Sequence, residues 1–347
     1  MRVLVMVVTA ASAIAQQVPV TNAKLETQAL SGSLAAALRS AGSGSGPRWV
    51  GYVVPAVEGA GSSCCWDSRY GQGCHLEPVT RPGTVGGRQT VQLEGEQYTT
   101  VLFRYENGQL SKLRGFSGDC NLDAGGLTFV VLTGVRASES AEMLAGYVTP
   151  QAFQARPTDK IAEGAMQALA RHRDPVADRA LERFVEPSQP ENLRSKVVFW
   201  LGSTRGKRGL EMLNRLAAQD PSDRVREQVA FGYSTSREPD AMTALINMAK
   251  SDRSPRVRGQ ALFWMAQKAG DKVASMITDA IRDDPETEVK KKAVFALSQL
   301  PADQGVPRLI DVARTNRNPE VRKQAMFWLG QSKDKRAVDF FEAVLTK

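Results

Sequence analysis

Apolar residues recur at one fixed interval through the second half of the chain. The recurrence is clearest in five phenylalanines that stand 32 residues apart: Phe199, Phe231, Phe263, Phe295 and Phe327. Leu or Val stands six residues before each of them, and Leu, Tyr or Met stands two residues after. A sixth, degenerate unit precedes them, with apolar residues at the matching positions: Ile161, Ala165, Leu169 and Leu181. Self-similarity of this kind predicts stacked structural repeats that share a continuous core.

Each unit predicts a pair of helices. In the first, Leu193, Val197 and Leu201 recur at the helical spacing, and their apolar neighbours widen that face. We therefore expect the first helix to be covered on several sides. The second helix has a narrower stripe that includes Leu210 and Leu213, so one of its faces should meet solvent. Polar residues at one shared position suit helix N-caps: Ser222, Ser254 and Asn318.

The polar positions of the unit give it a family resemblance. The pattern Asp-x5-Arg-x2-Ala-x3-Leu stands here as Asp252, Arg258, Ala261 and Met265, and it resembles the short HEAT-type repeat, also seen in bilin-lyase-like proteins. The resemblance covers residues 158–347. It implies a ladder of ion pairs between neighbouring units that joins Asp220, Asp252 and Asp284 to Arg226, Arg258 and Lys290. Exposed ion pairs contribute only ~0.2–1 kcal/mol each. Asn316 interrupts the Asp series and puts the last rung in doubt.

The first half of the chain predicts strands instead of helices. Four segments are strand candidates: 49–57, 98–105, 109–116 and 127–135. The first of them, 49–57, is rich in Val and aromatic residues. The sequence Glu106-Asn107-Gly108 between two of them is a hairpin-turn signal. We expect an α+β protein: a flexible arm at 16–47 with a weak helix at 23–39, a small antiparallel β domain at 48–149, and a HEAT-like α-solenoid of about six repeats at 150–347.

The first 15 residues have the layout of a secretory signal peptide. Arg2 supplies an early positive charge, a short apolar run follows, and Ala13-Ile14-Ala15 forms an Ala-x-Ala site before Gln16. The apolar run is shorter than the roughly 20 residues that span a bilayer. We therefore expect a periplasmic or secreted protein without a transmembrane segment.

Four cysteines all lie in the first half: Cys64, Cys65, Cys74 and Cys120. An even number in an exported chain favours two disulfides. A Cys64–Cys65 bond would be strained, so we expect one of that pair to join Cys74 and the other to join Cys120. A metal site that adds His75 is the alternative, but its spacing matches no zinc ribbon. No metal and no cofactor are expected.

The net charge of +8 belongs mainly to the repeats, which carry 33 Lys and Arg against 26 Asp and Glu from residue 158 onward. Three basic residues share one repeat position near the end of the second helix: Lys250, Arg282 and Arg314. They form either a ridge for an acidic partner or a complement to the helix dipoles. Three tryptophans recur in alternate units, either as core or as a binding stripe: Trp200, Trp264 and Trp328.

The sequence offers no credible active site. Ser332 and Lys335 match a Ser-x-x-Lys signature, but they lie in an interhelical turn without partner motifs. His75 and His172 have no identifiable nucleophile. The leading hypothesis is an exported, non-enzymatic scaffold that binds another protein, of unknown oligomeric state. The alternatives are a bilin-lyase-like enzyme or cofactor-handling protein, and a nucleic-acid-binding HEAT-type protein. Export to a compartment with little nucleic acid argues against the last.

Overall fold

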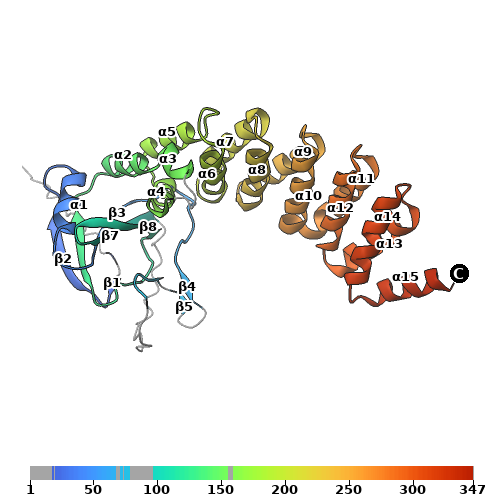
Figure 1. The fold of residues 1–347 in the computed structure, drawn as a ribbon, viewed down its shortest axis with the longest axis horizontal. Helices are drawn as coiled ribbons and strands as arrows, with labels where there is room; N and C mark the ends of the chain where they lie inside the picture. Colours follow the sequence, from blue (N-terminus) through green and yellow to red (C-terminus); the bar gives the residue numbers. More distant parts are fainter. Residues whose placement is uncertain are drawn as a thin grey trace, which may run out of the picture.

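A mixed β-sheet at one end of the molecule is joined to an arch of paired helices (Figure 1). The computed structural model describes residues 18, 20–67, 71–72, 74–78, 97–154 and 159–346. The signal peptide expected at residues 1–15 lies outside the described residues. Within those ranges, the helices are all too short or too polar to cross a membrane.

The central sheet has five strands in the order β2 (Lys24–Ala29), β10 (Thr128–Thr133), β3 (Arg48–Pro55), β7 (Tyr98–Glu106) and β8 (Gln109–Ser117). The last three pair antiparallel, as expected. However, β10 runs parallel to both β2 and β3, so the prediction of a purely antiparallel sheet is wrong. Parallel strands require a crossover connection. Here helix α1 (Leu34–Gly42) lies in the connection from β2 to β3.

The flexible arm predicted at 16–47 is also wrong where the structure describes it. Residues 24–29 form the edge strand β2, which is largely exposed and has no apolar alternation. Helix α1 begins after Ser33, whose side chain accepts a hydrogen bond from the Ala36 N–H, and it buries Leu34 and Leu38. Backbone pairing with β10 therefore orders a segment whose side chains gave no strand signal.

The predicted hairpin between β7 and β8 is confirmed. Asn107 and Gly108 both have positive φ, at 52° and 74°. That pair of conformations is typical of the tight turns that match the twist of two antiparallel strands.

Both faces of the sheet are buried. On one face, Val50, Tyr52 and Phe103 belong to a core that continues through the helices to the far end of the array. On the other face, Trp49, Leu102 and other apolar side chains pack with the cysteine-bearing loops. Short strands organise these loops: β1 (Val20–Thr21), β9 (Leu122–Asp123) and β6 (Cys74–His75) pair in parallel, and β4 (Trp66–Asp67) pairs with β5 (Gly71–Gln72).

Helices α2 (Ala137–Tyr147) and α3 (Pro150–Gln154) lead to six helical hairpins. Their helices are α4 (Lys160–Arg171), α5 (Pro175–Phe184), α6 (Glu191–Thr204), α7 (Gly206–Gln219), α8 (Asp223–Thr235), α9 (Asp240–Ser251), α10 (Pro255–Ala269), α11 (Ala274–Asp283), α12 (Thr287–Ser298), α13 (Ala302–Thr315), α14 (Pro319–Gln331) and α15 (Lys335–Leu345). Each even-numbered helix packs on the next even-numbered one, along the inner edge of the arch (Figure 1). The predicted inner stripe is confirmed, because Leu193, Val197 and Leu201 are fully buried.

Two of the three predicted N-caps form their hydrogen bonds. The side chains of Ser222 and Asn318 accept backbone N–H bonds from Val225 and Glu320. Ser254 stands at the same position, but its hydroxyl donates instead to the carboxylate of Asp223 in the preceding unit, at 2.5 Å. The residue at this repeat position therefore either caps its own helix or forms a hydrogen bond to the neighbouring unit.

The array and the sheet share one core, because α4 packs directly on β8. Two glycines permit the close approach. A Cβ on Gly164 would lie 2.1 Å from the Leu113 carbonyl oxygen, and a Cβ on Gly115 would lie 2.8 Å from the Ala168 Cα. The degenerate first unit is thus the one that meets the sheet.

Candidate protein-binding surface

The five phenylalanines that define the repeat lie at the inner surface of the arch. Phe199 and Phe327 are 38% and 54% exposed, and the other three are half-buried. The first helix of a unit is covered on several sides, as expected, because α8 packs on α6, α7, α9 and α10. The side that carries the phenylalanines is the exception. Helix-to-helix stacking is provided by Val and Leu at other positions, such as Val225 and Val257. The phenylalanines remain on the side that no neighbouring helix covers.

The aromatic rings form one continuous series, which we call the aromatic ladder. Phe199 stacks on Phe231 at 5.9 Å between ring centroids, and Phe263 stacks on Phe295 at 5.7 Å. Tryptophans join these pairs, with Phe231 at 4.6 Å from Trp264. The complete ladder has eight members: Phe199, Trp200, Phe231, Phe263, Trp264, Phe295, Phe327 and Trp328. Offset and edge contacts at these separations are favourable, so the rings hold one another in place.

The three tryptophans are half-buried, so they lie between the core position and the exposed stripe that the sequence left open. They pack against the array core and also contact the phenylalanines of the ladder. The equivalent position holds Gly232 and Ala296 in the intervening units. Within the described part of the chain, the indole N–H groups of Trp264 and Trp328 have no hydrogen-bond partner.

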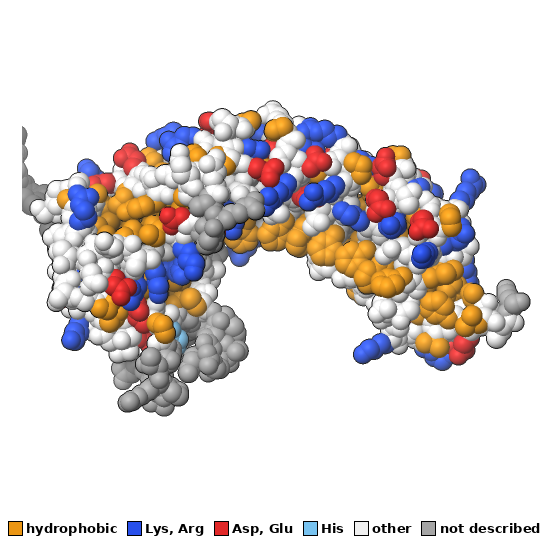
Figure 2. Space-filling view, in the orientation of Figure 1, with side chains coloured by type: hydrophobic (Ala, Val, Ile, Leu, Met, Phe, Trp, Pro, Cys, Tyr) orange, Lys and Arg blue, Asp and Glu red, His pale blue; other side chains and the backbone are white. Residues whose placement is uncertain are grey.

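Figure 2 shows the result on the molecular surface. A hydrophobic band follows the inner edge of the arch, over the helices that carry the ladder, and charged side chains lie on the flank above it. Extended apolar surfaces on soluble proteins commonly mark interaction sites.

Arg and Asp side chains form a ladder of their own inside the array, but one unit out of the predicted register. The Asp carboxylates accept from the Arg of the preceding unit: Arg194 with Asp220, Arg226 with Asp252, and Arg258 with Asp284, at 2.8–2.9 Å. The Arg six residues after each Asp bonds its backbone carbonyl instead, as Arg226 does to Asp220. The periodicity is the same for both pairings, so the sequence alone could not separate them.

The prediction that these ion pairs are exposed is also wrong, because both side chains of each pair are buried or nearly so. The Arg226 side chain is fully buried and the Asp252 side chain is 5% exposed. Removal of one partner from such a pair typically costs about 3–5 kcal/mol, because a buried charge is left uncompensated. The next rung is absent as an ion pair: Lys290 donates to the Arg282 carbonyl, and Asn316 stands where Asp would be.

The three basic residues proposed as a ridge are placed differently from one another. Lys250 and Arg282 line one groove of about 520 Å³ between α9 and α11. Arg282 is ion-paired with Asp279 and Asp283, both at 2.8 Å. Arg314 lies over the Phe340 ring at 5.3 Å. All three stand in the last turns of their helices, where they complement the dipole.

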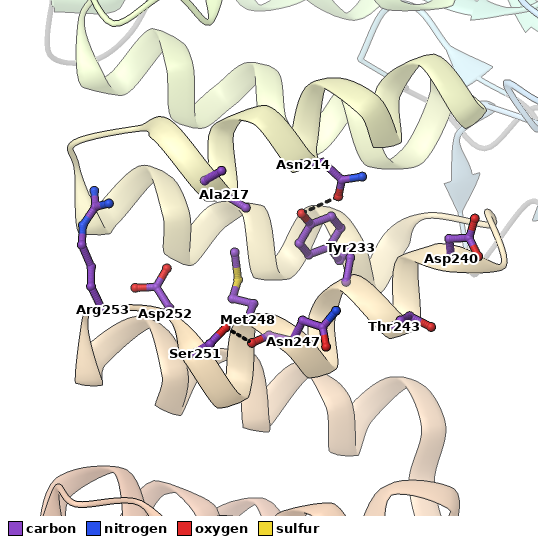
Figure 3. Close-up of a pocket in the computed structure, with 12 residues that line it drawn as sticks. Asn214, Ala217, Tyr233, Asp240, Thr243, Asn247, Met248, Ser251, Asp252 and Arg253 are labelled. Carbon is purple, nitrogen blue, oxygen red and sulfur yellow. Dashed lines mark hydrogen bonds between the residues drawn. The ribbon is translucent and has the colours of Figure 1, made fainter.

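A second groove, of about 590 Å³, separates α7 and α9 on the outer side of the array (Figure 3). Tyr233 donates a hydrogen bond to Asn214 across its floor at 2.8 Å, and burial raises the pKa of Tyr233. Asp252 reaches it from the ion-pair ladder. The residues lining it include no His or Cys. This groove is a gap between the outer helices of neighbouring units.

The cysteines are joined in the pattern expected from sequence. Cys64 bonds Cys120 at 2.05 Å, and Cys65 bonds Cys74 at 2.23 Å. His75 lies beside them and contacts Asp123 at 3.2 Å. The sulfurs of Cys64, Cys74 and Cys120 lie within 4.8 Å of one another, a spacing that could also hold a metal ion. In this structure all of them are engaged in disulfides.

A Ser–His contact that the sequence did not reveal lies at the junction of sheet and array. Ser140 Oγ is 3.1 Å from His172 Nε2 and 2.7 Å from the Tyr52 hydroxyl. All three side chains are fully buried. No substrate can reach this serine, so the contact is structural. Ser332, from the Ser-x-x-Lys match, accepts a hydrogen bond from the Asp334 N–H in a turn.

Comparison with known proteins bears on the helical part of the chain. Residues 177–266 and 274–347 match the family described as HEAT repeats. A solved structure of human deoxyhypusine hydroxylase in complex with glycerol is 17% identical, with a TM-score of 0.31, and the match covers 61% of this chain and 80% of that one. At that TM-score the likeness says nothing about activity. No curated protein matches the chain. The family match, the six hairpins and the 32-residue period agree: residues 177–266 and 274–347 are HEAT repeats.

Proposed function

We propose that this protein is an exported, non-enzymatic scaffold that binds another protein along the aromatic ladder. The observation that carries the proposal is the exposure of stacked Phe and Trp rings along the inner edge of a solenoid. Curved repeat arrays use extended concave surfaces for binding. Aromatic side chains dominate the energetic centres of protein interfaces because they bury a large area at low entropic cost.

The partner that best fits the ladder is an extended or helical protein segment with regularly spaced apolar side chains. The rings run from unit to unit in a line, so they offer a narrow apolar track instead of a single deep pocket. The basic ridge is the weaker candidate surface. The charge of Arg282 is already balanced by two carboxylates, and Arg314 is engaged by an aromatic ring.

Export is supported by two features of different kinds. The first 15 residues have the pattern of a secretory signal. Four cysteines stand in two disulfides in the part of the chain that has short strands and long loops. Disulfides persist in oxidising compartments and are rare in the cytosol.

Site-specific cross-linking in the native host tests the binding proposal. A photoreactive phenylalanine analogue would replace Phe263 on the ladder, or Thr243 on the exposed side of α9 as the matched control. We expect one defined partner protein to be captured from position 263 and not from position 243.

The intact mass of the same purified chain tests export. It should give Gln16 as the mature N-terminus.

The captured partner then allows a quantitative comparison. The double variant Phe199→Ser/Phe327→Ser alters the two most exposed ladder rings. A hot-spot residue contributes about 2 kcal/mol or more to the binding free energy, and its loss raises the Kd roughly 30-fold. We expect the Kd of the double variant to rise by this factor while its circular dichroism spectrum stays unchanged. Equal capture at both positions, or unchanged affinity of the double variant, would contradict the proposal.

A further inference from the structure

The two disulfides touch each other. The Sγ atoms of Cys74 and Cys120, which belong to different bonds, are 3.5 Å apart. Thiolate and disulfide sulfurs react when they are held at about 3–3.5 Å. The two sulfurs are therefore within the distance at which exchange from one disulfide to the other takes place.

The four cysteines differ in exposure. Cys74 and Cys120 are each 2% exposed and belong to the apolar core under the sheet, Cys64 is half-buried, and Cys65 is exposed. Cys65 is therefore the residue at which we expect an external thiol to enter.

Cys74 is equipped to leave as a thiolate. The backbone N–H of Cys65 donates a hydrogen bond to Cys74 Sγ at 2.9 Å. A donor aimed at sulfur favours its charged form, and a more stable thiolate is a better leaving group in exchange.

We propose that the four cysteines form a two-stage thiol–disulfide relay that oxidises one pair of thiols in another protein per chain, as a stoichiometric exchange and not a catalytic cycle. In the first stage a substrate thiolate attacks Cys65 Sγ, the Cys65–Cys74 bond breaks, and Cys74 leaves as a thiolate. The second substrate thiolate attacks the substrate sulfur of the mixed disulfide and expels the Cys65 thiolate. The substrate loses two electrons and two protons, and Cys65 and Cys74 gain them.

In the second stage the Cys74 thiolate attacks Cys120 Sγ. A Cys74–Cys120 bond forms, the Cys64–Cys120 bond breaks, and Cys64 leaves as a thiolate and takes the proton that Cys74 released. No electrons leave the protein in this step. The remaining disulfide then joins the two most buried cysteines, and the two thiols stand on the adjacent, more accessible Cys64 and Cys65.

The new bond makes the proposal testable in the full-length native chain. Dithiothreitol, or a synthetic peptide carrying two thiols, is added at less than one equivalent, and the reaction is quenched with acid and alkylated. Peptide mapping should find a Cys74–Cys120 disulfide with Cys64 and Cys65 alkylated, and oxidised probe in equal amount. Alkylated Cys65 and Cys74 with an intact Cys64–Cys120 bond would overturn the relay. Four reduced cysteines with bound zinc would overturn it as well.

Paired variants separate the two stages. Cys64→Ser/Cys120→Ser removes the second stage, so the probe should still be oxidised while Cys65 and Cys74 remain as thiols. Cys65→Ser/Cys74→Ser removes the accessible bond and should lose oxidation of the probe. Unchanged oxidation in the second variant contradicts the assignment of Cys65 as the entry sulfur. The helical circular dichroism signal of each variant shows that the array is folded.

Discussion

At the scale of single residues, His172 is a titratable group held inside the core at the junction of sheet and array. It is fully buried at the end of α4, with Nε2 at hydrogen-bond distance from Ser140. Its Nδ1 has no hydrogen-bond partner in the part of the chain that the structure covers. Burial lowers the pKa of His172 to about 4; nearby Asp174 opposes this shift and Arg205 adds to it. The imidazole is therefore neutral in the folded protein at neutral pH.

The free energy of unfolding should consequently decrease as the pH is lowered, because His172 takes up a proton more readily in the unfolded chain. The unfolded chain binds a proton at His172 near pH 6.5, whereas the folded chain does so only near pH 4. The stabilising contribution is complete above about pH 6.5 and is lost as the pH falls from there to about 4. Between about pH 7.5 and about pH 4.5, we expect a loss of about 2–3 kcal/mol from this group.

Urea unfolding of the wild type and of His172→Gln at both pH values measures this contribution. The amide keeps a polar contact for Ser140 but does not titrate. Carboxylates elsewhere contribute equally to both proteins, so the difference between the two pH dependences isolates His172. The same pH dependence in both proteins would contradict the buried neutral imidazole.

At the scale of elements, the contact of α4 with β8 depends on the absence of two side chains. A Cβ on Gly164 would lie 2.1 Å from a backbone oxygen, which cannot move aside as a flexible side chain would. We expect Gly164→Ala to separate the helix from the strand and to cost ~1–3 kcal/mol, the usual cost of overpacking. Gly146→Ala, in α2 with open space around it, should instead stabilise by roughly 0.5–1 kcal/mol through helix propensity. Thermal unfolding of both variants tests the contrast, and equal effects would contradict it.

The elements also show what sequence patterns can and cannot specify. The 32-residue period located the helical pairs, because each unit must bury a stripe such as Leu193 and Val197. The period could not distinguish a fully buried position from a half-buried one. Phe263, which is half-buried, recurs as regularly as Val257, which is fully buried. The sequence did not predict strand β2. Its pairing with β10 uses backbone groups, and its largely exposed side chains show no alternation of apolar and polar residues. The pairing of the cysteines was narrowed correctly, because geometry disfavours a bond between neighbours.

At the scale of the whole molecule, the buried ion-pair ladder ends before the array does. Three rungs join the units from α6 to the α11–α12 connection, and the next has Lys290 and Asn316 in place of Arg and Asp. Stability in a solenoid is approximately a sum of units and nearest-neighbour interfaces. The α14–α15 hairpin lacks such a rung, so it should open more readily than the units that a rung joins.

The double variant Lys290→Arg/Asn316→Asp restores the missing rung. We expect slower hydrogen exchange in α14 and α15, equivalent to ~1 kcal/mol of local stability for a pair near the surface. Each single substitution serves as a control and should give less protection than the pair. Unchanged exchange in the double variant would show that the ladder does not determine the opening of this end.

The alternation of Trp with Gly232 and Ala296 gives the inner surface a translational period of two units, twice that of the backbone. A ligand seated on one Phe–Trp pair finds an equivalent seat two units along, whereas a shift by one unit sets the same side chain against a position without a large ring. For the protein partner proposed above, several equivalent frames would add a statistical contribution to affinity that grows with the number of units. They would also permit stepwise sliding, in which the partner changes frame while part of it remains bound. The surface would thus bind its partner in several alternative positions, two units apart, instead of in one fixed position.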